Sequence, residues 1–418
     1  MTANAKHGDC IAKTCRGCGL LCDDVSIELT SGKLKFANLC STGESWYQSR
    51  LDQSRSAGCL VAGRTVSSRE ATAAVAKTLG NSRAAVFAGL EWLDTRSQQS
   101  VVDLVRKTGG FVSPAVSECN SAGLKAFQRY GRATCTLGEI GRHKGLVCFW
   151  NVGNAEVPPR LIEKYLAESN SVWNISPEKN ADIPGASKLG ERFSSIYATR
   201  KEQLHFIRQL RSKKAGNLTD NAGSLKTLFE QFQEAEHITF FVDKGKNDGP
   251  DPVMDGLHQL ARSLNAVVPS VILELGAVAN SGSAREVLGW STGQFSSSCF
   301  VPESGAAIES GGSLRDRLFA GDYDLAVIFD SQFLDEQVVA TLSDRGKRKL
   351  ICLDSAESGL TKKADILIRI SETGWNHGGD FFRLDGIPIA IDPLVTSDRI
   401  NVREVVDGVL ETMNGVHA

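Results

Sequence analysis

The sequence lacks several features that would assign it to common classes of protein. It has no run of about 18 apolar residues, the length that a membrane-spanning helix needs, so we expect no membrane segment. Its 47 basic and 49 acidic residues give a net charge of -2, which leaves no basic surplus for binding nucleic acid. The segment Met1 to Asp9 is polar and contains no apolar signal core, so we predict a cytoplasmic protein.

Two kinds of catalytic signature are also missing from the sequence. The seven histidines show no metal-binding spacing, so we interpret them as structural or surface groups. No Ser-His-Asp arrangement and no metal-hydrolase motif is visible either. The sequence therefore predicts no hydrolytic centre of these kinds in this chain.

Cysteine, in contrast, is abundant, with eleven residues in a chain of 418. In a reducing compartment these residues are not expected to form structural disulfides. Four of them lie within residues 15–40, whereas the other seven are scattered along the chain. We therefore expect ligands near the N-terminus and mainly buried thiols elsewhere.

The clustered cysteines follow a pattern typical of a metal site. Cys15, Cys18 and Cys22 are separated by two and three residues, and Cys40 follows after a further 17. Thiolates are soft ligands that suit zinc or an iron–sulfur cluster, and three on one turn with a distant fourth can hold a [4Fe–4S] cube. The second spacing favours the cluster, while zinc or a set of reduced thiols stay open as alternatives.

The rest of the chain alternates apolar strand-like runs with amphipathic helical stretches, which predicts α/β units with parallel sheets. The Val101–Val105 stretch fits one face of a helix, and Asp251 followed by Pro252 fits a helix start. The predicted strands are residues 84–90, 145–153, 171–176, 237–245, 324–332 and 349–355. Ligands on such sheets bind beyond the carboxyl ends of the strands, so loops such as 89–95 and 330–335 are candidate binding elements.

This pattern predicts two Rossmann-like α/β units of similar topology behind a small N-terminal cysteine-knuckle subdomain. A stretch rich in Gly and Ser, residues 276–313, is interpreted as an insertion over a site. The predicted divisions are 1–69 for the knuckle and linker, 70–220 for the first α/β unit, 221–373 for the second unit with its insertion, and 374–418 for an irregular C-terminal closing segment.

Several motifs together resemble the B subunit of formylmethanofuran dehydrogenase, a member of the molybdopterin oxidoreductase family. The similarity follows the order of the family's motifs along nearly the whole chain, and TLGE and GWSTG are its most specific parts. The motifs are CRGCGLLCDD (15–24), NLCSTG (38–43), ECNSAGLKAFQRYGRATCTLGEI (118–140), FWNVGNAEVPPR (149–160), GWSTGQ (289–294), FFRLDGIPI (381–389) and DPLVTSD (392–398).

The resemblance implies a fold of the molybdopterin oxidoreductase type and a set of cofactor ligands. Cys119 matches the family's ligand to tungsten or molybdenum, which is chemically sensible for a metal-bound thiolate. The [4Fe–4S] ligands correspond to Cys15, Cys18, Cys22 and Cys40, and the loop that receives a molybdopterin or tungstopterin guanine dinucleotide corresponds to Asn151, Gly153 and Asn154.

The chain also departs from the family at positions that matter for catalysis. The family has His directly after the metal-binding cysteine, and here that residue is Asn120. An imidazole can carry protons near neutral pH, whereas an amide cannot. No Arg lies between Arg285 and Arg315 to steer formate or CO2. We therefore expect this chain to have lost catalytic activity of its own.

This pattern of loss fits a second, hydrolytic branch of the family, the formyltransferase/hydrolase complex. The branch works in one-carbon metabolism linked to tetrahydromethanopterin, and its B subunit serves as a scaffold. The partners that the resemblance implies are an A subunit of the amidohydrolase type, a C subunit and a formyltransferase subunit. The alternative is a redox-active oxidoreductase subunit that interconverts formate and CO2, which the retained Cys119 favours.

Overall fold

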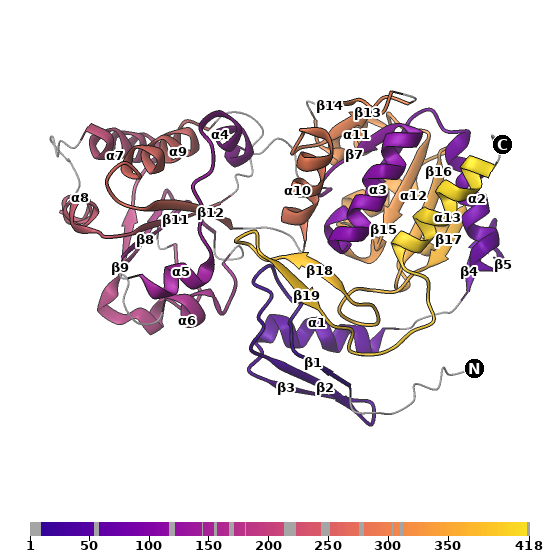
Figure 1. Ribbon diagram of the computed structural model, residues 1–418, viewed down its shortest axis with the longest axis horizontal. Helices are drawn as coiled ribbons and strands as arrows, with labels where there is room; N and C mark the ends of the chain where they lie inside the picture. Colours follow the sequence, from indigo (N-terminus) through magenta and orange to yellow (C-terminus); the bar gives the residue numbers. More distant parts are fainter. Residues whose placement is uncertain are drawn as a thin grey trace. The chain divides into compact units, whose positions relative to one another are not determined.

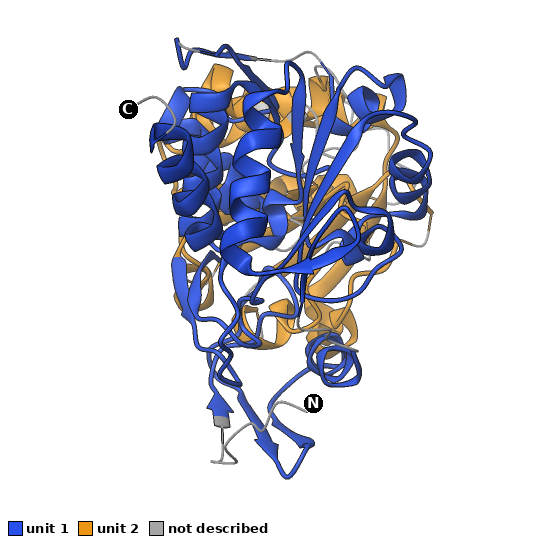
Figure 2. Ribbon diagram, turned by 90° about the vertical axis from the view of Figure 1, so that its right-hand side faces the viewer, with its two compact units in different colours: residues 1–119, 278–383, 388–418 blue, residues 120–277, 384–387 orange. Residues whose placement is uncertain are grey.

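The computed structural model divides the chain into two compact units (Figure 2). Unit 1 comprises residues 1–119, 278–383 and 388–418, and unit 2 comprises residues 120–277 and 384–387. The structure describes residues 10–53, 58–116, 122–143, 145–153, 157–166, 171–179, 181–212, 223–243, 251–275, 280–302, 304–309 and 312–415. Within these ranges, no helix has both the length and the apolar character needed to cross a membrane.

A nine-stranded sheet forms the centre of unit 1 in its described residues (Figure 1). Its strands, in order across the sheet, are β14 (Ala307–Glu309), β13 (Ser298–Phe300), β7 (Gly110–Val112), β6 (Ala85–Ala88), β15 (Leu325–Phe329), β16 (Lys349–Asp354), β17 (Ile366–Arg369), β4 (Cys59–Val61) and β5 (Arg64–Val66). The central run from β7 to β17 is parallel, and the pairings that join β13 and β4 to its two ends are antiparallel.

Both faces of this sheet are buried, as the apolar composition of the strands requires. Along β15, Leu325, Val327 and Phe329 enter one hydrophobic core, while Ala326 and Ile328 enter the other. The first face is covered by α2 (Ser68–Gly80), α3 (Thr95–Thr108), α10 (Ser281–Thr292) and α13 (Val402–Gly415), and the second by α11 (Leu314–Ala320) and α12 (Glu336–Ser343).

The N-terminal segment adds a small antiparallel sheet and one helix to unit 1. The strands are β1 (Cys10–Ala12), β2 (Ser26–Thr30) and β3 (Lys33–Ala37), and α1 (Ser41–Asp52) follows them. A separate hairpin is formed by β18 (Gly379–Phe382) and β19 (Pro388–Ile391). Leu21 packs into one hydrophobic cluster with Phe381 and Ile391 of that hairpin, so the cysteine-rich turn contacts the C-terminal part of the chain.

Unit 2 is a second α/β unit, with a five-stranded sheet in the residues described there. Every strand pairing in this sheet is parallel. Its strands, in order, are β10 (Phe193–Tyr197), β9 (Ser171–Ser176), β8 (Leu146–Trp150), β11 (Ile238–Asp243) and β12 (Ser270–Leu275). Its helices are α4 (Ala122–Tyr130), α5 (Leu137–Arg142), α6 (Leu161–Tyr165), α7 (Arg200–Ser212), α8 (Ser224–Glu234) and α9 (Pro252–Leu264).

The α/β class with parallel sheets is confirmed, and so are several elements. The predicted helix over the Val101–Val105 stretch is α3, and Asp251 caps α9 by accepting hydrogen bonds from the N–H groups of Val253 and Met254. The division of the chain differs from the predicted ranges, because β6 pairs with β15 and β8 pairs with β11. Each sheet therefore combines strands from both predicted units, 70–220 and 221–373.

Two further segments differ from their predicted form. Within 276–313, the described residues form α10, β13 and β14, so this stretch extends the sheet and covers one face. The segment 374–418 was expected to be irregular, yet it forms the β18–β19 hairpin and the long helix α13. The sequence of α13 has its buried valines at helical spacing, which the aromatic and Gly-rich residues before it obscured.

The ends of β15 and β16 are joined by a reciprocal pair of aspartate contacts. The carboxylate of Asp330 accepts the Ser355 N–H at 3.0 Å, and the carboxylate of Asp354 accepts the N–H of Ser331 and, at 3.0 Å, its hydroxyl. Both acids are buried, and burial is the main cause that raises the pKa of Asp330 to about 6 and that of Asp354 to about 7. The charge of Asp330 also disfavours ionisation of Asp354.

These raised pKa values make the stability of unit 1 dependent on pH. A carboxyl whose pKa is higher in the folded than in the unfolded state stabilises the fold at low pH, and the contribution is lost as pH rises through the folded value. We expect the free energy of unfolding to fall by about 4 kcal/mol between pH 5 and pH 8, and Asp354→Asn to remove more than half of that fall. Denaturant unfolding at several pH values measures this, with Asp407→Asn on the exposed side of α13 as control. A wild-type unfolding free energy that is flat over this pH range contradicts the expectation.

Candidate functional site

The cysteine-rich turn closes on itself through backbone hydrogen bonds. The N–H of Cys15 donates to the Cys22 carbonyl at 2.8 Å, and the N–H of Leu21 donates to the Cys18 carbonyl at 3.2 Å. Leu21 adopts a positive φ of 44°, which reverses the chain just before Cys22. These contacts place three of the four predicted ligands on one tight turn.

The fourth cysteine returns to this turn through the β2–β3 hairpin. The hairpin reverses at Ser31 and Gly32, and Asn38 leaves it with a φ of 58°. The side-chain amide of Asn38 donates to both the carbonyl and the carboxylate of Asp24 at 2.8 Å, which fixes the returning strand beside the turn. Cys40 then stands at the N-cap of α1, where its side chain makes no capping hydrogen bond.

Two glycines allow close packing around the Cys15 sulfur. A Cβ at Gly43 would lie 2.9 Å from Cys15 Sγ, and one at Gly17 would lie 2.7 Å from the Gly43 Cα. The N–H of Gly17 donates to Cys15 Sγ at 3.2 Å. Amide donors directed at sulfur stabilise a thiolate bound to a cluster. Larger residues at these two positions would push the start of α1 away from the turn.

The four thiols are electrostatically coupled but do not form a compact ion site. Burial raises the pKa of Cys15 and of Cys18 to about 12, and the nearby Cys22 and Cys40 add to the rise in both. Among the residues that the structure describes, no group of three or more His, Cys, Asp or Glu side chains is placed to hold a metal ion. The donor set of four sulfurs with a directed amide is chemically suited to a thiolate-ligated group, and its occupant stays a prediction.

The second part of the predicted site falls mostly outside the described residues. Cys119 and Asn120, the predicted metal ligand and the replacement of the family His, lie there, and so does Asn154. Asn151 and Gly153 are described and follow the carboxyl end of β8. The structure therefore positions only these two residues of the predicted pterin-binding loop.

The side chain of Asn151 is engaged within unit 2. Asn151 has a φ of 56°, and its amide exchanges two hydrogen bonds with Gln203 of α7, at 2.9 and 2.8 Å. Gln203 also accepts the indole N–H of Trp150 at 3.0 Å and donates to the Ala198 carbonyl at 2.9 Å. The Asn151 side-chain amide therefore holds the strand end in place, and the Asn151 backbone N–H donates to the Ile175 carbonyl of β9 at 2.9 Å.

Gln203 was not singled out by the sequence, because nothing in its local pattern marks it apart from other helical glutamines. A pocket of about 310 Å³ was also not foreseen. It follows β9, and its lining comes from a turn with glycines at positive φ: Asp182, Ile183, Gly185, Ala186, Ser187, Gly190 and Phe193. Such turns leave no signal of a pocket in the sequence because the contacts depend on the fold.

Gln203→Met should destabilise unit 2 by about 2 kcal/mol, because it leaves the Trp150 indole and the Asn151 amide without their buried partner. Chemical denaturation monitored by tryptophan fluorescence measures the change. Lys201→Met on the exposed side of the same helix is the control and should leave stability nearly unchanged. Equal unfolding free energies for the two variants would show that the Gln203 contacts contribute nothing.

Comparison with known proteins adds independent information on this chain. No family model matches it. It is 21% identical over 408 residues to the B subunit of the tungsten-containing formylmethanofuran dehydrogenase 2 of Methanococcus maripaludis, covering 91% of this chain and 93% of the relative. The corresponding subunit of Methanocaldococcus jannaschii is 23% identical over 310 residues, covering 70% of this chain and 71% of the relative.

A solved structure has a similar fold. It is the formyltransferase/hydrolase complex (FhcABCD) of Methylorubrum extorquens in complex with methylofuran, which contains a chain that matches with a TM-score of 0.67 and 18% identity. The match covers 86% of this chain and 99% of the other. The resemblance predicted from the motifs is therefore confirmed: along most of its length the chain is similar to the B subunit of formylmethanofuran dehydrogenase, and its fold is similar to that of a chain of the formyltransferase/hydrolase complex.

Proposed function

We propose that this chain is the B subunit of a formyltransferase/hydrolase complex and that its role there is structural. The similarity to a chain of the FhcABCD complex over 99% of that chain carries the proposal, because no large part of the neighbour lacks a counterpart here. Asn120 in place of the family His supports the hydrolytic branch, since an amide cannot carry the protons that redox turnover requires.

In such a complex the reaction moves a formyl group between one-carbon carriers and releases it as formate by hydrolysis. The proposed partners are an A subunit of the amidohydrolase type, a C subunit and a formyltransferase subunit. This chain shows no hydrolase signature in its sequence, so its contribution is to hold the assembly together. The engaged Asn151 side chain agrees with a loop that no longer serves a cofactor.

We further propose a [4Fe–4S] cluster held by Cys15, Cys18, Cys22 and Cys40. When bound, such a cluster supplies electron transfer or a rigid cross-link between chain segments. The chain itself supplies four sulfurs, the Gly17 N–H directed at one of them, and the glycine contact with the start of α1. In the structural role, the cluster would fix the β2–β3 hairpin and α1 to the turn.

The alternative function is that of a redox-active subunit that carries a molybdopterin or tungstopterin guanine dinucleotide and interconverts formate and CO2. Retention of a cysteine at position 119, together with the four N-terminal cysteines, favours this alternative. The names of the two relatives specify tungsten for those proteins. Under the alternative function, tungsten is the metal that we would expect this chain to carry.

Metal analysis of the complex purified without oxygen separates the two functions. We expect iron with a broad visible absorption band, no stoichiometric tungsten or molybdenum, and loss of both iron and the band in Cys22→Ser. Cys299→Ser, outside the knuckle, is the matched control and should keep them. Stoichiometric tungsten or molybdenum, or formate release that depends on either metal, would overturn the structural role. Iron-free protein would overturn the cluster.

A further inference from the structure

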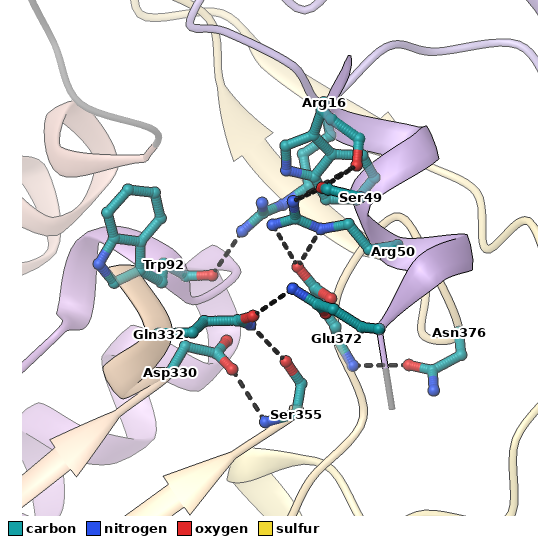
Figure 3. A network of polar contacts seen from close by, with 11 residues as sticks. Arg16, Ser49, Arg50, Trp92, Asp330, Gln332, Ser355, Glu372 and Asn376 are labelled. Carbon is teal, nitrogen blue, oxygen red and sulfur yellow. Dashed lines mark hydrogen bonds and ion pairs between the residues drawn. The ribbon is translucent and has the colours of Figure 1, made fainter. Parts of the chain in front are cut away.

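The carboxyl edge of the parallel strands in unit 1 is filled by side chains from the N-terminal segment. Arg16, from the cysteine-rich turn, is 4% exposed, and Arg50, from α1, is 5% exposed. Ligands of α/β sheets bind beyond this edge. Figure 3 shows both guanidinium groups here, close to residues that follow β6, β15, β16 and β17.

The two arginines share one aromatic ring. The guanidinium carbon of Arg50 lies 4.1 Å from the centroid of the Trp46 ring, and that of Arg16 lies 5.1 Å from the same centroid. A planar guanidinium over an indole is an attractive contact that strengthens when water is excluded. Trp46 and Arg50 both belong to α1, so this ring links the helix to the cysteine-rich turn.

Each arginine also contacts a second ring that comes from the body of unit 1. Arg16 lies 4.8 Å from the Phe381 ring of β18, and Arg50 lies 5.0 Å from the Phe333 ring in the 3-10 turn η4 (Ser331–Phe333). Arg16 Nη2 donates to the Trp92 carbonyl at 2.8 Å, at the end of the 3-10 turn η1 (Leu90–Trp92) after β6. The cysteine-rich turn and α1 are thereby tied to three separate parts of unit 1.

Glu372 supplies the carboxylate that contacts Arg50, and the charge of Asp330 also acts on Arg16. Nε and Nη2 of Arg50 approach Glu372 Oε1 at 3.0 and 2.9 Å, and both side chains are buried (Figure 3). Burial lowers the pKa of Arg16, and the nearby Glu372 charge opposes that effect. A buried cation requires a nearby anion, so removal of the Glu372 charge leaves Arg50 without its paired carboxylate and leaves Arg16 with the smaller contribution of Asp330.

Hydrogen bonds within the turn that carries Glu372 fix the position of this residue. The Glu372 N–H donates to Asn376 Oδ1 at 2.6 Å, and its carbonyl accepts N–H groups from Trp375, Asn376 and His377. Gly374 in the same turn has a φ of 84°, and a Cβ there would lie 3.0 Å from Cδ of Arg16. The turn therefore binds the acid rigidly and also contacts the aliphatic stem of Arg16.

We propose that Glu372 is a positioning residue for the cysteine-rich turn, acting through Arg50, Trp46 and Arg16. Arg16 lies in sequence between Cys15 and Cys18, so the contacts that fix Arg16 also fix the sulfurs on either side. We call Arg16, Arg50, Trp46 and Glu372 the arginine seat. The inference rests on the proposed function only in taking the four cysteines as the working part of the knuckle.

The role of the arginine seat in positioning the turn can be tested by measuring thiol accessibility. The full-length protein is first reduced and treated with a chelator to remove metal. The rate of iodoacetamide labelling is measured for each cysteine by peptide mass spectrometry. In Glu372→Gln we expect labelling of the buried Cys15 and Cys22 to rise about tenfold, because local opening of the turn becomes easier. Labelling of Cys148 and Cys352, in the cores of the two units, should not change.

Two further variants sharpen the result. Asp392→Asn, an exposed acid in the same C-terminal segment, is the matched control and should label like the wild type. Arg50→Lys keeps the charge but loses the planar contact with Trp46, so we expect a smaller rise at Cys15 and Cys22 than in Glu372→Gln. If Glu372→Gln does not accumulate as folded protein, Arg50→Lys decides by the same pattern of labelling.

An unchanged rate at Cys15 and Cys22 would overturn the proposal. So would a parallel rise at Cys148 and Cys352, because it would mean general loss of stability without a local effect on the turn. Since the measurement needs neither bound metal nor partner subunits, a negative metal analysis leaves this test intact. Failure of the seat and failure of the proposed function are thus distinguishable.

Discussion

The structure of unit 1 depends on two guanidinium groups that are buried at the carboxyl ends of its parallel strands. Water cannot solvate them there, so aromatic faces, two backbone carbonyls, the Ser49 hydroxyl and the Glu372 carboxylate must replace it. Those partners come from α1, η1, η4, β18 and the turn after β17. The same contacts occupy the edge where an α/β sheet usually receives a ligand, which makes the N-terminal segment part of the body of unit 1.

The strands of both sheets could be predicted from the sequence because they are buried on two faces and read as short apolar runs. β9 coincides with its prediction, and β8, β11, β15 and β16 end within a few residues of theirs. Their partners could not be predicted in the same way. The pairing of β6 with β15 depends on contacts far apart in the sequence, and apolar runs carry little information about which neighbour they select.

The candidate site, too, could be predicted from the sequence only in part. Cysteine spacing pointed to the turn at 15–22 because metal ligands must recur at short intervals, and the structure gathers those residues on one hydrogen-bonded loop. Asn151 was assigned through the resemblance, but its amide is engaged by Gln203, a residue with no local signature. The arginine seat was equally invisible, since Arg50 and Glu372 are ordinary surface-type residues until the fold buries them together.

The segmented construction of unit 1 also has a consequence during synthesis. The cysteine-rich turn is made before unit 2, whereas Glu372 and Phe381 are added after all but four residues of unit 2. Unit 2 can begin folding on the ribosome because it is a nearly continuous stretch of chain. The cysteine-rich turn, in contrast, lacks its contacts with the Glu372 turn and Phe381 until those residues have left the ribosome. The contacts that fix the thiols of the turn can therefore form only after Glu372 and Phe381 have been synthesised.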